Sequence, residues 1–198
     1  MKAIYTTLLI LGALLLSGCW TKTPPTARYD LGTIDQQPRF TCQSAPLKLA
    51  YTTAAPPYNS DRLIYRDADG KIISYTYSRW AAPLPQMVDE FALLMLRQAC
   101  PSSTIIAPQM EMATSDKLML RLINIHRQGG EKEEAIVTIE ITLKQKDGQF
   151  SQKTFTVRHP IDQPDKTSST VNALRLALHQ ALLEGLSWAL GQNHPHHH

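Results

Sequence analysis

Three consecutive stretches decide the fold of this chain: KLMLRLINIHR at 117–127, AIVTIEITLKQK at 135–146 and FSQKTFTVRH at 150–159. Each is rich in residues that favour β-strands and has the length of one. Gly129-Gly130 separates the first two stretches, and Lys146-Asp147-Gly148-Gln149 supplies an Asp-Gly turn before the third. The three stretches therefore predict an antiparallel meander.

One helix is expected before this meander in the sequence and one after it. Residues 85–99 are almost entirely apolar and begin with a proline, which the first helical turn tolerates because its missing N–H would be unpaired there. Asp89 and Glu90 come early, where negative charge favours the helix dipole. The last element is a long helix with N-cap oxygens offered at 168–170 and an end at Gly191.

Short strands are expected before the first helix. Asp67-Ala68-Asp69-Gly70 lies between β-prone runs at 63–66 and 72–77, which is a strong hairpin signal. Tyr29–Gly32 and Leu47–Thr52 are predicted as further strands. The order strands, helix, strand meander, helix predicts an α+β domain in which two main helices pack on an antiparallel sheet.

The last helix has more apolar surface than one sheet can cover. One face carries Val171, Leu174, Leu178, Ala181, Leu182, Gly185 and Ala189, while Leu176, Leu183 and Leu190 form a second stripe on nearly the opposite side. The second stripe is covered either by the other helix and loops or by a subunit or partner. A homo-oligomer is one such possibility.

The first residues indicate export and lipidation. Lys2 precedes an apolar run to Leu16 that is too short to span a bilayer and has the length of a signal-peptide core. Leu16-Ser17-Gly18-Cys19 has the pattern of a bacterial lipobox, in which Cys19 receives a diacylglycerol and an N-acyl chain such as palmitate. A plain secreted protein and an uncleaved anchor helix are the alternatives.

The lipobox also predicts the organisation and location of the mature chain. Trp20 follows the lipidated cysteine, and the absence of Asp there favours the periplasmic face of the outer membrane over inner-membrane retention. We expect a removed signal peptide at 1–18, a lipid anchor and tether at 19–27, a single domain at 28–192 and a His-rich tail at 193–198.

The remaining two cysteines are Cys42 and Cys100. The predicted periplasmic location is oxidising, so a disulfide between them is expected. Two unpaired buried thiols are the alternative. No other covalent group or cofactor is indicated by the sequence.

No pattern of catalysis, metal binding or nucleic-acid binding is visible. The net charge of +3 is spread along the chain without a basic run, which argues against nucleic acid. Phosphate-binding and nucleophile-elbow motifs are missing, and His126, His159 and His179 have no ligand spacing to Cys, Asp or Glu. His126, His159 and His179 are therefore expected to be ordinary surface or half-buried side chains.

The hairpin region also resembles a known family. Arg62-Leu63-Ile64-Tyr65-Arg66, then Ile73-Ser74-Tyr75, then Ser78-Arg79-Trp80-Ala81-Ala82-Pro83 before an apolar helix resemble the ABC-type transport auxiliary lipoproteins. This family includes PqiC and the auxiliary subunits of MCE-type lipid transport systems. Tyr29-Asp30-Leu31-Gly32 is similar to the family's opening motif.

The resemblance implies a non-catalytic subunit of a lipid transport system that links the inner and outer membranes. Its partners would be a periplasmic MCE-domain protein, which it docks, and indirectly an ABC permease and ATPase. The residues that the family pattern nominates for partner binding are Arg62, Tyr65, Arg66, Arg79 and Trp80.

Other interpretations stay open from the sequence. Arg79 and Trp80 either lock the hairpin onto the helix start, with Trp80 buried, or form an exposed anchor at an interface. The protein as a whole is alternatively a lipid-binding carrier, with a cavity near Leu94, Met95 and Leu182, or a regulator of cell-wall synthesis.

Overall fold

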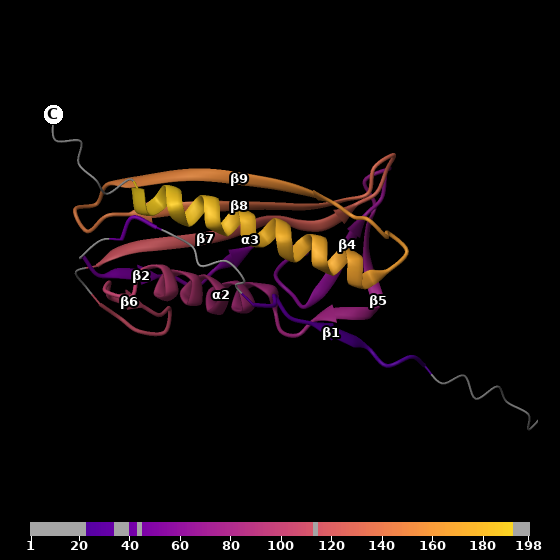
Figure 1. The fold of residues 1–198 in the computed structure, drawn as a ribbon, viewed down its shortest axis with the longest axis horizontal. Helices are drawn as coiled ribbons and strands as arrows, with labels where there is room; N and C mark the ends of the chain where they lie inside the picture. Colours follow the sequence, from indigo (N-terminus) through magenta and orange to yellow (C-terminus); the bar gives the residue numbers. More distant parts are fainter. Residues whose placement is uncertain (1–22, 34–39, 43–44, 113–114, 192–198) are drawn as a thin grey trace, which may run out of the picture.

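The computed structural model describes residues 23–33, 40–42, 45–112 and 115–191. Cys19, the signal peptide and the His-rich tail lie outside these residues. The elements are β1 (Ala27–Tyr29), β2 (Leu47–Leu49), β3 (Thr53–Ala54), β4 (Arg62–Arg66), β5 (Ile72–Trp80), α2 (Leu84–Ala99), β6 (Ile105–Ile106), β7 (Asp116–Gln128), β8 (Glu134–Lys144), β9 (Phe150–Pro160) and α3 (Thr167–Gly191) (Figure 1).

The meander β7–β8–β9 forms the long part of the sheet, as predicted. β7 and β8 pair antiparallel from Lys117 opposite Lys144 to Gln128 opposite Glu134, and β8 pairs with the whole of β9. On its other edge β7 meets three short strands in succession, β2, β3 and β4. β7 is therefore the strand on which both halves of the sheet are assembled.

The sheet is mixed, whereas the sequence predicted an antiparallel one. β2, β3 and β4 all run parallel to β7, and β1 runs parallel to β5. The residues of a short strand do not indicate whether it pairs parallel or antiparallel. The direction of β2, β3 and β4 relative to β7 depends instead on the path of the loops and of α2 between them. The β4–β5 hairpin is antiparallel and turns at Gly70 (φ +85°), as predicted.

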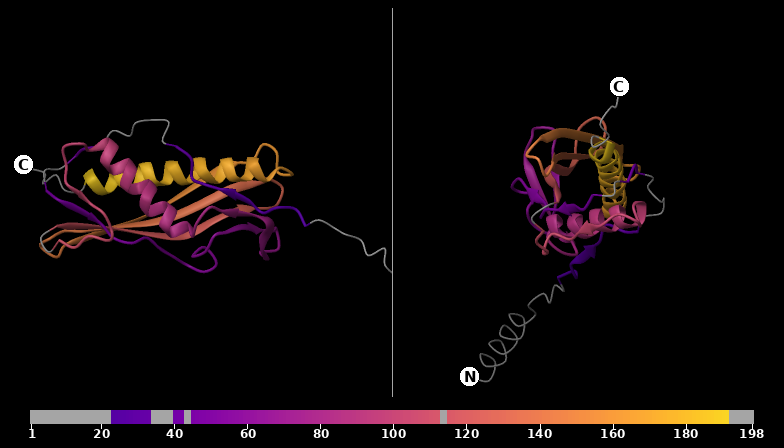
Figure 2. Two further views of the ribbon diagram at one scale, coloured as in Figure 1. Left: turned by 90° about the horizontal axis from the view of Figure 1, so that it is seen from below. Right: turned by 90° about the vertical axis from the view of Figure 1, so that its left-hand side faces the viewer.

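Both helices cover the same face of the sheet (Figure 2). α3 lies along β8 and β9, and α2 crosses beside it. Leu118, Leu120 and Leu122 of β7 are fully buried beneath the helices. Gly185 of α3 lies so close to Ile141 that a Cβ there would collide with it, so this glycine lets the helix approach the sheet.

A β-bulge in β7 decides which side chains face the helices near the end of that strand. The pairing with β8 shifts between Leu122 and Asn124, so one extra residue changes the phase of the alternation. Ile125 and Arg127 thereby stand opposite the inward-facing Val137 and Ala135. The bulge aims Arg127 toward the interior of the domain.

Four local expectations are corrected by the structure. β1 ends at Tyr29 rather than Gly32, and the strand expected at 47–52 ends at Leu49 with all three of its residues buried. Asp89 lies beyond the first turn of α2 and accepts a hydrogen bond from the Thr52 N–H at 2.7 Å. α3 begins at Thr167, ahead of the predicted N-cap residues.

Candidate functional site

The five residues nominated by the family pattern lie on one hairpin, β4–β5, but in different surroundings. Arg62 and Arg66 are exposed, Tyr65 and Arg79 are half-buried, and Trp80 is buried. The hairpin therefore divides into a base that is built into the domain and a tip that projects from it.

The base of the hairpin is held by Trp80 and Asp61. The Trp80 N–H donates to the Asp61 carbonyl oxygen at 2.8 Å, and the indole lies in the core. Arg79 Nη1 donates to Asp61 Oδ1 at 3.1 Å, and Arg28 of β1 lies 3.7 Å from the other carboxylate oxygen. Both ion pairs are partly exposed and contribute at most about 1 kcal/mol each. Trp80 is thus buried at the base of the hairpin and Arg79 is paired with Asp61, which are the contacts that the locking interpretation expects.

Arg127 connects the middle of the hairpin to the rest of the domain. Its Nε donates to Glu133 Oε2 at 2.7 Å, and its Nη1 donates to the Pro164 carbonyl oxygen at 2.6 Å and to Tyr75 Oη at 3.1 Å. Its guanidinium also lies over the Tyr65 ring, 4.9 Å from the centroid. The hydrogen bond to Glu133 raises the pKa of Arg127, so this cation is permanent.

Tyr58 and His126 form a buried polar pair. Tyr58 Oη and His126 Nδ1 are 3.0 Å apart and share a hydrogen bond, and both side chains are buried. Burial lowers the pKa of His126, and the positive charges of Arg66 and Arg158 lower it further. His126 is therefore neutral at pH 7, and it is more deeply buried than the sequence predicted.

The chain after β1 is fastened to the two helices. His179 of α3 donates from Nε2 to the Leu31 carbonyl oxygen at 2.9 Å and stacks on Phe91 of α2, with ring centroids 4.2 Å apart. Gly32 (φ +75°) lies directly against the Arg175 guanidinium, where a larger residue would collide. The family-like Tyr29–Gly32 segment thus ties the tether side of the domain to the helical layer.

A shallow groove of about 400 Å³ runs beside α2. Leu94 lines it, as expected for a lipid-binding carrier, but Met95 and Leu182 are buried in the core instead. The full lining is Asp30, Leu31, Gly32, Met87, Glu90, Phe91, Leu93, Leu94 and Arg97.

The second apolar stripe of α3 is only partly covered. Leu190 is buried, whereas Leu176 and Leu183 are exposed. The helices and loops therefore account for one end of the stripe and leave the rest at the surface.

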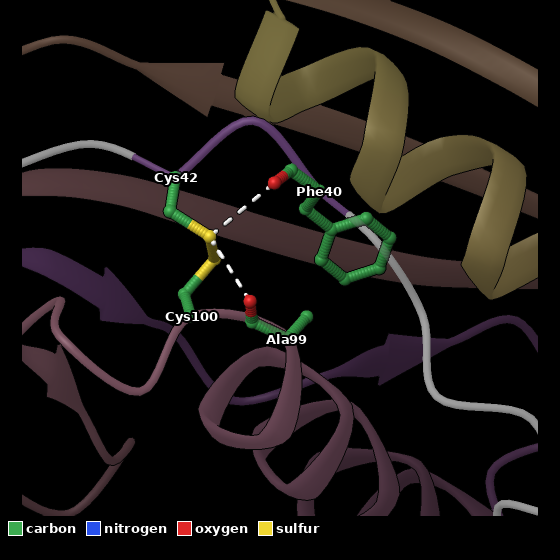
Figure 3. The surroundings of a disulfide bond; sticks show 4 residues. All are labelled: Phe40, Cys42, Ala99 and Cys100. Atoms are coloured by element: carbon green, nitrogen blue, oxygen red, sulfur yellow. Dashed lines mark hydrogen bonds between the residues drawn. A yellow bond between two sulfur atoms is a disulfide. The ribbon is translucent and has the colours of Figure 1, made fainter.

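Cys42 and Cys100 form a disulfide with a Cα–Cα distance of 5.4 Å (Figure 3). It joins the segment after β1 to the C-terminal end of α2. Cys42 Sγ lies 3.2 Å from the Ala99 carbonyl oxygen and 3.4 Å from that of Phe40. Since a disulfide sulfur carries no proton, these are close S···O contacts.

The molecule has two distinct ends (Figures 1 and 2). Residues 23–26 lead into β1 at the end that also carries the tip of the β4–β5 hairpin and the β7–β8 turn. The opposite end carries the β8–β9 turn and the loop between β6 and β7, with Phe150, Met110 and Met112 exposed. Lys48 Nζ pairs with Glu111 Oε1 at 2.7 Å and so holds this loop against β2.

Two features are absent from residues 23–33, 40–42, 45–112 and 115–191, a membrane-spanning helix and a metal-binding cluster. None of the helices in those ranges combines the length and apolar character that crossing a bilayer requires. Across the same ranges, no group of three or more His, Cys, Asp or Glu side chains is arranged to hold a metal ion.

The sequence model of the family described as ABC-type transport auxiliary lipoprotein component matches residues 29–192. Protein XCC0632 from Xanthomonas campestris has a similar crystal structure, with a TM-score of 0.67 and 22% sequence identity over 85% of this chain and 95% of that one. An uncharacterized protein of known crystal structure gives a TM-score of 0.68 and 18% identity over 86% and 100%.

A weaker likeness is to PelC from Paraburkholderia phytofirmans, crystallised as a dodecamer, with a TM-score of 0.43 and 11% identity over 77% of this chain and 93% of that one. Similarity at this level carries no argument about assembly. The comparison with curated proteins gave no match.

Proposed function

The chain belongs to the family of ABC-type transport auxiliary lipoprotein components, and on this premise we propose that it is a non-catalytic outer-membrane subunit of an MCE-type lipid transport system. In this proposal the signal peptide at 1–18 is removed, Cys19 carries the diacylglycerol and N-acyl chains, and residues 19–27 tether the domain at 28–192 to the periplasmic face of the outer membrane. The domain docks the periplasmic MCE component, which connects it to the permease and ATPase.

The observation that carries the docking proposal is the separation of the two ends of the domain. β8 has 11 residues, so its ends lie about 34 Å apart at the rise of an antiparallel strand. If the tether end faces the membrane, the opposite end points into the periplasm, toward a partner that arrives from the inner membrane. That end exposes Met110, Met112 and Phe150, and apolar and Met side chains are favoured at the centres of interfaces.

The first experiment is a pull-down of the lipidated protein from its native envelope in mild detergent, with mass spectrometry of proteins and lipids. The proposal expects an MCE-domain protein together with its permease and ATPase. Recovery of a cell-wall synthase instead would favour the regulator hypothesis and overturn the proposal.

Photo-crosslinking then tests which end docks. A benzophenone amino acid at Phe150 or Met110 should crosslink to the MCE partner in living cells. The matched control is the same amino acid at Arg121, which is also exposed but lies midway along β7. Equal crosslinking from Arg121 and Phe150, or none from Phe150 when the pull-down succeeds, would refute docking by this end.

The groove beside α2 favours one second candidate, a lipid-binding carrier. Its apolar wall includes Phe91 and Leu94, and its volume of about 400 Å³ is within the range of small-molecule sites. A stoichiometric phospholipid in the extracted protein, lost in Leu94→Glu but retained in Leu176→Glu, would support this candidate. Both leucines are exposed helix residues, so neither change disturbs the core.

A further inference from the structure

The β4–β5 hairpin exposes three large apolar side chains, two of them at its tip. Ile72 and Ile73, next to the turn and on opposite faces of β5, are 49% and 40% exposed. Tyr77, between the middle of the hairpin and its base, is 44% exposed. Lys71 and Arg66 flank them and are also exposed. Three large apolar side chains on one projecting element indicate a contact surface.

The rest of the described chain leaves this part of β5 open. Residues 72–74 pair with β4 on one edge, whereas β1 reaches only Ser78 to Trp80 on the other. The base of the hairpin is fixed by Trp80 and its middle by Arg127, so the tip projects from a rigid support. A supported tip holds its apolar side chains in place for an external contact.

The tether determines what lies next to this tip. β1 runs parallel to β5 with Ala27 opposite Ser78, so the residues before Ala27 leave on the side of Tyr77. The eight residue steps from Cys19 to Ala27 span at most about 28 Å. Ile72 lies six residues from Ser78, which is at most about 20 Å along the strand. A bilayer that holds the acyl chains of Cys19 is therefore within reach of the tip.

We propose that the tip of the β4–β5 hairpin rests in the interfacial layer of the phospholipid bilayer that holds the lipid anchor. Ile72 and Ile73 enter the boundary of the acyl chains, and Tyr77 places its ring at the level of the headgroups, where aromatic side chains gather. The inference rests on the lipid anchor of the proposed function. It adds a second membrane contact that fixes how the domain stands on the membrane.

The tip carries two cations and two carboxylates. Lys71 and Arg66 lie where headgroup phosphates would be, and basic residues next to a bilayer are attracted to anionic lipids. The acidic side chains at the turn are Asp67 and Asp69, and Asp67 Oδ1 accepts the Lys71 N–H at 2.7 Å as part of the turn. The two carboxylates balance the two cations, so the exposed apolar side chains supply the attraction to the bilayer and the cations supply contacts to headgroup phosphates.

The other apolar end does not satisfy the same geometry. Phe150 is 70% exposed at the β8–β9 turn, which has its own lysines. The 11 residues of β9 separate it from the tether end by about 34 Å, which exceeds the reach of the tether. Phe150 is therefore the matched control for a membrane contact at Ile73.

Spin labelling of the lipidated, full-length protein in vesicles of phosphatidylethanolamine and phosphatidylglycerol tests the proposal. Of the three cysteines, Cys19 is acylated and the other two are bridged, so Ile73→Cys or Phe150→Cys adds the one free thiol for a nitroxide. Power saturation then compares collisions with oxygen, which enters the bilayer, and with a water-soluble nickel chelate. We expect the label at 73 to lose access to the chelate and the label at 150 to keep it.

A second variant separates insertion from a change in fold. Ile72→Asp with Tyr77→Asp, in the Ile73→Cys background, alters only exposed positions and should restore access to the chelate while the thermal midpoint stays unchanged. Equal chelate access at 73 and 150 in an acylated chain overturns this proposal alone. Protection at 73 that arises only when a partner protein is added also overturns it, because the tip is then a protein contact. A chain that mass spectrometry finds unacylated overturns the anchor and this proposal together.

Discussion

Replacing Arg127 with Met should destabilise the domain by about 3 kcal/mol. The change keeps an apolar stem of similar length and removes the guanidinium, which is bonded to Glu133, Pro164 and Tyr75. A hydrogen bond to a charged group contributes about 1.5–3 kcal/mol net. The side chains of Arg127 and Glu133 are 16% and 22% exposed, so solvent screens part of their ion pair. The expected loss is therefore smaller than the sum of the three hydrogen-bond contributions.

The assay is urea unfolding of the mature domain with the disulfide intact. With a slope of about 2 kcal/mol per molar urea, the midpoint should fall by about 1.5 M without a change in slope. Arg121→Met is the control on the same strand, because its side chain is 57% exposed and lies 3.8 Å from Glu140. It should cost less than about 0.5 kcal/mol.

A double variant tests the reason for the loss. If the unpaired Glu133 carboxylate is a large part of the cost, Arg127→Met with Glu133→Gln should be more stable than Arg127→Met alone. The reasoning is refuted if Arg127→Met and Arg121→Met have similar midpoints. It is also refuted if the second substitution simply adds its own destabilisation.

Three further predictions concern buried polar groups and the disulfide. Burial lowers the pKa of His126 in the folded state below its unfolded value of about 6.5. The stability of the parent should therefore decline as the pH falls below about 6.5, because the unfolded state then binds the proton more readily. The unfolding free energy of His126→Gln should decline less over this range. Burial raises the pKa of Asp89, which means that its ionised form is disfavoured in the fold. Asp89→Asn keeps an acceptor for the Thr52 N–H, so it should match or exceed the stability of the parent at pH 7 and lose that gain toward pH 4. Asp89→Ala removes the acceptor and should lower the unfolding free energy by about 1–3 kcal/mol at pH 7. Cys42→Ser with Cys100→Ala opens a loop with a sequence separation of 58 and should cost about 4 kcal/mol in denaturant unfolding, a loss that reduction of the parent should reproduce.

Local patterns sufficed for the elements that depend on local interactions. The three long strands and their Asp-Gly turn, the hairpin turn at Gly70 and both helices lie within a few residues of the predicted bounds. Composition, period and turn residues act within one element or between neighbours, which is why the sequence carries them. The α+β class follows from their order.

The candidate site depended on contacts between distant residues. The family pattern nominated Arg62, Arg66 and Trp80, but it did not indicate that Trp80 is buried while the two arginines are exposed. The sequence did not indicate the role of Arg127, because only the bulge between Leu122 and Asn124 turns this side chain inward. No residue type in that strand predicts a bulge. Asp89 likewise has the sequence position of a dipole partner, although it binds a backbone N–H 37 residues away.

The sequence by itself determined the class of the fold, the hairpin, the pair of cysteines and the lipobox, since each is a pattern of residues close together in the chain. The tertiary structure decided the direction of the short strands, the inward turn of Arg127 and the position of the apolar hairpin tip at the tether end of the molecule. These features arise from strand pairings such as β1 with β5 and β4 with β7, whose partners are far apart in the chain. Pairing of that kind is selected by the packing of the whole domain, and a local pattern cannot specify it.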